Sequence, residues 1–543
     1  MSSVLRSIAS ADDDIREILR AAEAQTKGST FDRRTFLKVV GLASGGFVLA
    51  FYVGAPNIAN ANGKSTFAPN AFIRISPDGT ILIYSKGPEI GQGIKTAFPL
   101  IVAEELDADW AHVRVEQAPI NPAVYGRQSA GGSRSIPMSW DQLRKAGASA
   151  RAMLVSAAAK EWNVAASECR TASSVVYHDA SSRQLTYAAL SNKAAAVPVP
   201  DESTLRLKTR EEYKLLGTFV TGVDNHAIVT GQPLFGIDTV LPNMRYAVFE
   251  KCPAVGGKVR NANLDQIKKM PGVIDAFVVD GTGKVNEVMP GVAIVASSTW
   301  AALRAKRALE IDWDESDASK DSWSKAVAEA RELGKKEGDE TLKRVGDFDR
   351  AVADGKVVEA FYSYPFVAHA PMEPQNCTAW FHDGGIELWA PTQTPDAGLI
   401  AVANVLGLAQ EKVTVHQVRA GGGFGRRLIN DFMCEAAVIA KRAGVPIKLT
   451  WTREDDMQHD FFRVGGFHSL KGGIDKSGKL VAWADHFITF TADGEKPTSG
   501  GDISPEEFPA QLLPNVRLTQ TKLPLKIPTG PWRAPRSCAI AFP

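Results

Sequence analysis

Alternating apolar and polar residues predict two β-strands early in the chain, over 72–76 and 80–85. Pro77-Asp78-Gly79 separates them, a sequence typical of the tight turn of a hairpin. A glycine-containing segment, 86–93, then leads into a helix predicted over 96–106. The first elements are therefore a strand pair followed by a glycine turn and a helix.

A second turn-like segment, 130–135, is rich in glycine and serine and precedes a long alanine-rich helix, predicted from 140 to about 162. The stretch 198–214 is polar and reads as a linker. Strands and helices alternate over 215–313, with turn signals at 241–243 and 270–272.

The second half of the chain begins with a charged stretch, 317–355, that is predicted to be mostly helical. Strand and helix alternate again beyond residue 357. An apolar run over 413–418 leads into a glycine-rich segment, 421–427, and a helix predicted over 428–443 follows it.

Length and composition indicate a large globular protein. The 543 residues are 44% hydrophobic and 23% charged, so two to four domains are expected. A net charge of +1 gives no electrostatic reason to expect nucleic acid as a partner. The five cysteines are widely spaced with no Cys-x-x-Cys motif, which excludes a local zinc knuckle or iron–sulfur cradle.

The N-terminus resembles an export signal. Arg33 and Arg34 precede an apolar run over 39–54, which is the twin-arginine pattern of proteins exported in the folded state. Residues 59–61 offer a cleavage site, and without cleavage the run becomes a short anchor. We therefore expect a periplasmic protein, with membrane association open. The alternative is a short buried helix behind surface arginines.

The segment 421–427 carries the most chemical information. Its four glycines allow unusual backbone angles and close approach of amide groups to a ligand. Arg426 and Arg427 follow, and their guanidinium groups suit a phosphate or the pterin of a cofactor. The alternative is a simple glycine turn between strand and helix.

Six separated motifs together resemble the molybdenum-binding large subunit of the xanthine oxidase family, in the exported branch of isoquinoline 1-oxidoreductase and related aldehyde dehydrogenases. These motifs are Gly91-Gln92-Gly93, Gly132-Ser133-Arg134-Ser135, Thr392-Gln393 after Trp389, and residues 369–374, 421–427 and 530–535. The resemblance implies a mixed α/β (α+β) fold. It divides the chain into a leader (1–62), an N-terminal molybdopterin-binding segment (67–200), an α/β hammerhead-like domain (215–315) and a second molybdopterin-binding domain (357–543).

The resemblance also implies the site. Molybdenum is bound by a molybdopterin cytosine dinucleotide held between two cofactor-binding domains, with no metal ligand from a protein side chain. Gln393 and the Phe424 amide match groups beside the molybdenum oxo ligand, and Arg533 matches an arginine near substrate and metal. The other implied cofactor contacts are Gly91, Gln92, Gly93, Gly132, Ser133, Ser135, Gly422, Gly423 and Gly425.

Several of these polar residues have a structural alternative. Gln393 could be a buried amide that pairs with a backbone group. Glu89 and Glu373 could cap turns, and His369 could be a core histidine whose hydrogen bonds are satisfied. Arg463 could line the substrate side of the site, or it could be a surface residue.

Two departures from the family pattern bear on activity. Leu428 stands where purine-oxidising relatives have a glutamate, so we expect an aldehyde or a simple N-heteroaromatic substrate. No Gly-x-Gly-Glu motif, which carries the general base of the family, follows Arg533. From this we expect the chain to be C-terminally truncated and inactive alone.

The leading hypothesis is an oxidoreductase subunit that takes oxygen from water. Its electrons would pass to [2Fe-2S] clusters on a separate small subunit, because this chain lacks suitable cysteines, and possible onward transfer to a c-type cytochrome stays open. A non-catalytic scaffold that binds cofactor or partner is the second hypothesis. An exported flavin or nucleotide protein is the third, although a strand-embedded GxGxxG with its acidic partner is missing.

Overall fold

The computed structural model describes residues 47–52, 69–506 and 509–533. The chain forms two compact units. Unit 1 is Met1–Asp238 with Gln393–Asp396 and Thr414–Arg419. Unit 2 is Thr239–Thr392, Ala397–Val413 and Ala420–Pro543. The boundaries of the domains predicted above stay predictions, and each unit is described by itself.

The predicted hairpin forms the centre of a four-stranded sheet in unit 1. Its strands are β2 and β3, which pair antiparallel and turn at Gly79 with φ 90°. Helix α3 connects β3 to the parallel strand β4, which gives a β-α-β unit. The hairpin and this helix are confirmed. The bounds are β1 (Phe47–Tyr52), β2 (Pro69–Ile75), β3 (Ile81–Ser85), α3 (Ile94–Leu106) and β4 (Val113–Gln117).

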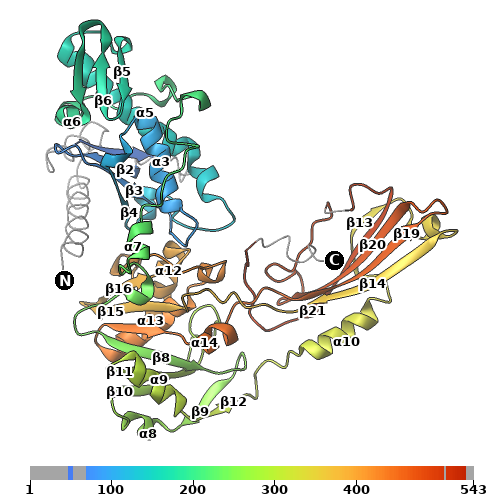
Figure 1. The fold of residues 1–543 in the computed structure, drawn as a ribbon. Coiled ribbons are helices and arrows are strands. Elements are labelled where there is room, and N and C mark those ends of the chain that lie inside the picture. Colours follow the sequence, from blue (N-terminus) through green and yellow to red (C-terminus); the bar gives the residue numbers. More distant parts are fainter. Residues whose placement is uncertain (1–46, 53–68, 507–508, 534–543) are drawn as a thin grey trace, which may run out of the picture. The chain divides into compact units, whose positions relative to one another are not determined.

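Helix α5 packs closely along α3 (Figure 1). A Cβ added to Gly147 of α5 would lie 2.3 Å from the Val102 carbonyl oxygen of α3, so only glycine permits this approach. The predicted helix is confirmed and starts earlier than expected, at Ser135. The remaining elements here are α4 (Pro122–Tyr125), α5 (Ser135–Trp162), β5 (Cys169–Ala172), β6 (Val175–His178), β7 (Arg183–Thr186), α6 (Tyr187–Ala195) and α7 (Asn225–Val229).

The polar linker over 198–214 is anchored to α3 by a buried carboxylate. Glu104 Oε1 lies 2.7 Å from Lys208 Nζ, and its Oε2 accepts hydrogen bonds from the amides of Lys214, Leu215 and Leu216. Burial alone would raise the pKa of this carboxyl, but Lys208 and the three amides outweigh it and hold the pKa below its usual range. The linker is therefore fixed against the core.

Unit 2 contains a mixed sheet in which strands remote in sequence lie side by side. Its order within the unit is β10-β11-β8-β18-β15-β16, and β18 joins β8 in parallel. Helix α13 packs on β15 and β18, whereas α9 packs on β8 and β11 (Figure 1). The bounds are β8 (Arg245–Lys251), β10 (Val273–Val279), β11 (Gly291–Ala296), α9 (Thr299–Arg307), β15 (Asn376–His382), β16 (Gly385–Ala390), α13 (Asp431–Ala443) and β18 (Ile447–Thr450). Two further elements, α12 (Pro395–Leu406) and β17 (Val413–Gln417), contain residues of both units.

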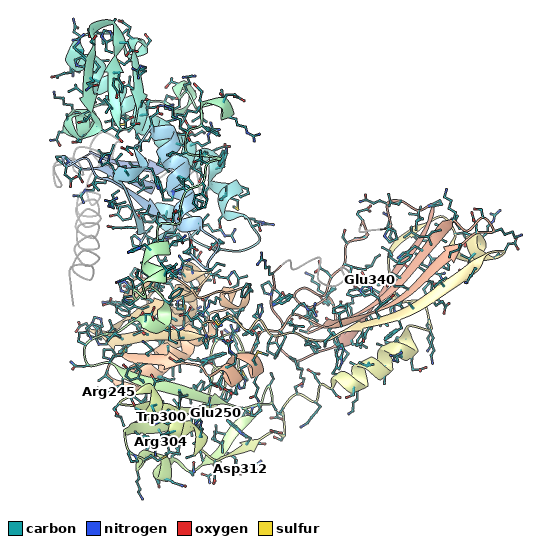
Figure 2. All side chains as sticks on the ribbon, in the orientation of Figure 1. Arg245, Glu250, Trp300, Arg304, Asp312 and Glu340 are labelled. Atoms are coloured by element: carbon teal, nitrogen blue, oxygen red, sulfur yellow. The ribbon has the colours of Figure 1, made fainter. Side chains whose placement is uncertain are left out.

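Helix α9 has one side packed on this sheet and one exposed side. Its buried residues, Ala302 and Ala305, join Val248 and Ile294 of the sheet in one apolar cluster. Trp300 is 61% exposed, and Trp300 and Arg304 stand out from the helix in Figure 2. Small apolar residues at this spacing produce a narrow packing stripe on a helix.

A second, five-stranded sheet in unit 2 corrects one prediction. Its order is β13-β21-β20-β19-β14, and β13 (Glu340–Val345) lies inside the stretch 317–355 that was predicted to be mostly helical. Charged residues suit β13 because it is an edge strand. Glu340 (Figure 2) lies 3.0 Å from Lys522 of β21. The other elements are β9 (Lys258–Ala262), α8 (Leu264–Lys268), β12 (Ile311–Asp314), α10 (Trp323–Leu333), α11 (Phe348–Val352), β14 (Lys356–Tyr364), α14 (Arg453–Gln458), β19 (Gly466–Ile474), β20 (Leu480–Thr491) and β21 (Asn515–Pro524).

The predicted export segment lies mostly outside the described residues, Arg33 and Arg34 included. Phe47–Tyr52, within its apolar run, forms strand β1 and pairs antiparallel with β2. Among the residues that the structure describes, none of the helices has the length and apolar character needed to span a bilayer. Export stays a prediction.

Candidate functional site

In unit 1, the first predicted cofactor loop follows β3 and is held by Glu89. Glu89 is buried, and its Oε1 accepts hydrogen bonds from the amides of Gly91 (2.8 Å) and Gly93 (3.1 Å). Its Oε2 accepts a third from Lys95 at the start of α3. The capping alternative for Glu89 is therefore confirmed. Gly91 and Gly93 have φ of 99° and 83°, and a Cβ on either would meet no atom within 4 Å.

Two side chains complete this loop. Gln92 bonds within it, since Nε2 donates to the Pro88 carbonyl and Oε1 accepts from the Ile90 amide. Lys86 Nζ donates to the Tyr125 carbonyl at 3.1 Å, and burial lowers the pKa of Lys86 to about 8. No role was predicted for Lys86, and only its place at the end of a strand before glycine could have indicated one.

The second predicted loop, 130–135, is joined to Gln393 within unit 1. Gln393 Nε2 donates to the Ala130 carbonyl at 2.8 Å, and the Ala130 amide donates to the Gln393 carbonyl at 2.8 Å. Gln393 is 3% exposed, so its contact fits a buried amide that pairs with a backbone group, and its place beside the molybdenum oxo ligand stays a prediction. Gly132 and Ser133 both have positive φ, 63° and 55°, and are exposed. Ser135 Oγ donates to the Ser129 carbonyl.

In unit 2, the glycine-rich loop offers free backbone donors. Gly422, Phe424 and Gly425 have φ of 97°, 56° and 115°. Among the described residues, the amides of Gly422, Gly423 and Phe424 donate to no acceptor. Consecutive amides turned outward by positive φ form an anion-binding concavity. The loop therefore fits a group with negative oxygens, such as the molybdenum cofactor of the resembled family.

Two buried side chains, Glu373 and Arg427, hold this loop in place through hydrogen bonds to its backbone. Glu373 Oε2 accepts from the Gly421 amide at 2.7 Å, which confirms the structural alternative for Glu373. Arg427 is fully buried and donates to the carbonyl oxygens of Gly422 (2.9 Å), Pro391 (3.1 Å) and Glu373 (2.8 Å). One guanidinium thus ties three separate segments together.

Arg426 is equally enclosed. Its Nη1 and Nη2 donate to both oxygens of Asp431, at 2.9 and 2.7 Å, and Nε lies 3.0 Å from Asp460 Oδ1. This last contact is ionic, because the N–H is not aligned for a hydrogen bond. Arg426 and Arg427 are both 0% exposed, so the structure uses them inside the loop where charge alone had predicted a phosphate or pterin contact. Carboxylates and carbonyl oxygens of the chain are their partners here, and the predicted phosphate or pterin contact stays a prediction.

Three of the predicted motifs meet at Gly425. A Cβ placed there would lie 1.8 Å from the Pro531 carbonyl oxygen and 3.2 Å from His369 Nε2. His369 Nε2 lies 3.1 Å from the same carbonyl oxygen, and Nδ1 lies 3.0 Å from each oxygen of Asp460. The satisfied core histidine is therefore confirmed. Arg533, two residues beyond Pro531, is exposed.

The predicted substrate residues lie near the same motifs in unit 2. Arg463 lies over the Trp532 ring at 5.6 Å and donates to the Pro365 carbonyl at 2.9 Å. Leu428 ends the short helical turn Arg426–Leu428 and is partly exposed. Asp460, which links Arg426 to His369, was not predicted, and its position in sequence carries no signal of that role. Within the described ranges, no cluster of His, Cys, Asp or Glu is arranged to hold a metal ion.

His459, next to Asp460, is expected to make the fold less stable in acid. Burial, followed by the nearby cations Lys251, Lys306 and Arg426, lowers the pKa of His459 to about 2. The unfolded imidazole takes up a proton below about pH 6.5 and the buried one does not, so stability falls as pH falls. Between pH 6 and 4.5 we expect a loss of about 2 kcal/mol from this residue. Urea unfolding should show that His459→Gln removes this loss, and an unchanged pH slope would contradict the prediction.

Comparisons with known proteins agree with the motifs. Two family profiles, each described as a molybdopterin cofactor-binding domain, match residues 15–230 and 333–493. The membrane-bound aldehyde dehydrogenase (pyrroloquinoline-quinone) of Gluconacetobacter polyoxogenes is 31% identical over 85% of this chain and 60% of its own. Isoquinoline 1-oxidoreductase subunit beta of Brevundimonas diminuta is 32% identical over 73% of this chain and 56% of its own.

The chain thus spans less than two thirds of the length of these relatives. Among solved structures, aldehyde oxidoreductase from Desulfovibrio gigas matches 64% of this chain and 43% of its own, at 16% identity and a TM-score of 0.46. A likeness this slight carries no argument about function. On the profiles and the two relatives, the chain belongs to the molybdenum-binding large subunits of the xanthine oxidase family, in the branch of isoquinoline 1-oxidoreductase and membrane-bound aldehyde dehydrogenase.

Proposed function

We propose that this chain is the large subunit of a molybdenum hydroxylase that oxidises an aldehyde or a simple N-heteroaromatic compound. The observation that carries the proposal is the glycine-rich loop of unit 2. Its amides over 422–424 donate to no acceptor among the described residues, and buried charges of Arg426, Arg427 and Glu373 support the loop. The names of the two relatives, an aldehyde dehydrogenase and an isoquinoline 1-oxidoreductase, support this substrate class.

Within the proposed site, the chain's own residues bind and orient. The amides of Gly422, Gly423 and Phe424 would donate to oxygens of the cofactor, which we propose is the cytosine dinucleotide form. The loops that contain Gly91, Gln92 and Gly132 are proposed as further cofactor contacts. When bound, the cofactor supplies the two-electron oxidation of the substrate with oxygen from water. Arg533 is proposed to lie beside the substrate.

The proposed cofactor is tested on the assembled, matured protein. Metal analysis should find close to one molybdenum per chain, and acid hydrolysis should release one cytidine monophosphate. A matured protein without molybdenum would overturn the proposal. Molybdenum together with a guanine nucleotide, or with no nucleotide, would overturn only the dinucleotide form.

Substrate choice is expected to follow from Leu428. A leucine cannot form hydrogen bonds with a polar purine, whose groups would stay unpaired in the site. We expect kcat/KM for aldehydes or isoquinoline-type heteroaromatics to exceed that for xanthine by about 100-fold or more. Steady-state kinetics of the full-length enzyme on a substrate panel measures this ratio, and efficient turnover of xanthine without aldehyde activity would contradict it.

Partners and location are also proposals. Electrons would leave through iron–sulfur clusters on a small second subunit, and a c-type cytochrome is a proposed acceptor. Export by the twin-arginine route to the periplasm rests on Arg33, Arg34 and the apolar run behind them. Replacement of both arginines by lysine should leave the protein in the cytoplasmic fraction. An unchanged periplasmic signal would contradict export by this route.

A further inference from the structure

We propose that His369 is a positioning residue that holds the segment bearing Arg533 against the glycine-rich loop. The inference rests on the proposed function, because there Arg533 lies beside the substrate. His369 itself is fully enclosed, with a side chain 0% exposed, so it cannot reach a substrate directly. Any effect it has on turnover must therefore act through its neighbours.

One side of the imidazole ring is fixed by Asp460. His369 Nδ1 lies 3.0 Å from both carboxylate oxygens, and the His369 backbone amide donates to the same carboxylate. Asp460 is itself held by Arg426, 3.0 Å away, which is anchored by Asp431. Every member of this chain of charges is buried. The ring therefore has a single orientation.

The other side of the ring points to the peptide that leads into Arg533. His369 Nε2 lies 3.1 Å from the Pro531 carbonyl oxygen, and Trp532 lies edge-on to the ring at 6.5 Å. The same carbonyl oxygen occupies the space that a Cβ of Gly425 would fill. Displacement of Pro531 would thus move Arg533 relative to the loop.

Both neighbours of the ring offer hydrogen-bond acceptors, a carboxylate and a carbonyl. Asparagine can place an amide donor near the position of Nδ1, whereas glutamine can place one near Nε2. The asparagine variant therefore keeps only the contact with Asp460, and the glutamine variant keeps only the contact with Pro531.

The test compares His369→Asn with His369→Gln in the matured complex of the full-length protein. If the contact with Pro531 positions Arg533, His369→Gln keeps kcat within about tenfold of wild type. His369→Asn loses about 100-fold, because misplacement by about 1 Å costs that much. Molybdenum content should be equal in both variants. Hydrogen exchange at residues 532 and 533, measured also on cofactor-free protein, should be faster only in the asparagine variant.

A matched control is His468→Asn in the five-stranded sheet. His468 is likewise buried, with Nδ1 2.8 Å from Asp485, so its replacement reports the cost of losing a histidine–aspartate pair elsewhere. We expect lower stability and unchanged kcat. Equal losses of kcat in both His369 variants, or better retention with asparagine, would overturn the inference. Wild-type protein without molybdenum would instead overturn the proposed function.

Discussion

Replacement of Gly425 by alanine is expected to have the largest effect of any single substitution in the loop. The added Cβ would lie 1.8 Å from the Pro531 carbonyl oxygen, and the residue would keep a φ of 115° that alanine avoids. Strain and overlap together should cost on the order of 3–5 kcal/mol in the free energy of unfolding. Urea unfolding and molybdenum content measure the result, and both should fall.

Gly444→Ala is the matched control for this substitution. Gly444 caps helix α13 with a φ of 67°, but a Cβ there meets no atom within 4 Å. The control should therefore lose only the backbone preference, about 1 kcal/mol, and retain its molybdenum. If Gly425→Ala costs no more than this control, the close approach of Pro531 does not exist in solution.

Arg427→Lys is expected to show the second large effect, although it preserves the charge. Lysine cannot reproduce a planar group that donates to three backbone carbonyls at once. Gly422, Pro391 and Glu373 would each be left with a buried unpaired oxygen, and we expect a loss of about 3 kcal/mol. Unfolding of cofactor-free protein is the measurement, because it separates support of the loop from contact with a phosphate.

Arg442→Lys, at the exposed end of α13, is the control and should change stability by less than about 0.5 kcal/mol. A cofactor-free Arg427→Lys protein as stable as wild type, but with weaker retention of molybdenum, would restore the phosphate role originally predicted from charge.

Local patterns predicted the first elements well. The Pro-Asp-Gly turn gave the hairpin of β2 and β3, and apolar spacing gave α3 to within two residues and the C-terminal end of α5, whose start lies five residues earlier than predicted. These elements depend on short-range preferences that a single sequence contains. The charged strand β13 was missed because its partner, β21, lies far along the chain and supplies the pairing.

In the candidate site, too, local features could be predicted from the sequence, whereas features set by distant partners could not. The sequence could predict that Gly422 and Gly425 adopt unusual backbone angles, because glycine has no side chain to prevent a positive φ. Arg427 could not be assigned from charge, because its partner Glu373 is distant in sequence. Arg426 pairs with nearby Asp431 and also with distant Asp460. Charge in a sequence predicts that a group needs a partner, but only the fold decides whether that partner is a ligand or another residue.

The discontinuity of unit 1 has a consequence for biosynthesis. Gln393, which bonds to Ala130, and Arg419, whose Nη1 lies 3.1 Å from Asp224 Oδ2, emerge from the ribosome long after residues 69–238. At ordinary rates of translation, this delay is on the order of tens of seconds. The nascent N-terminal region must wait that long with its loops unfinished. Cofactor insertion into that region is therefore expected to follow translation of residue 419.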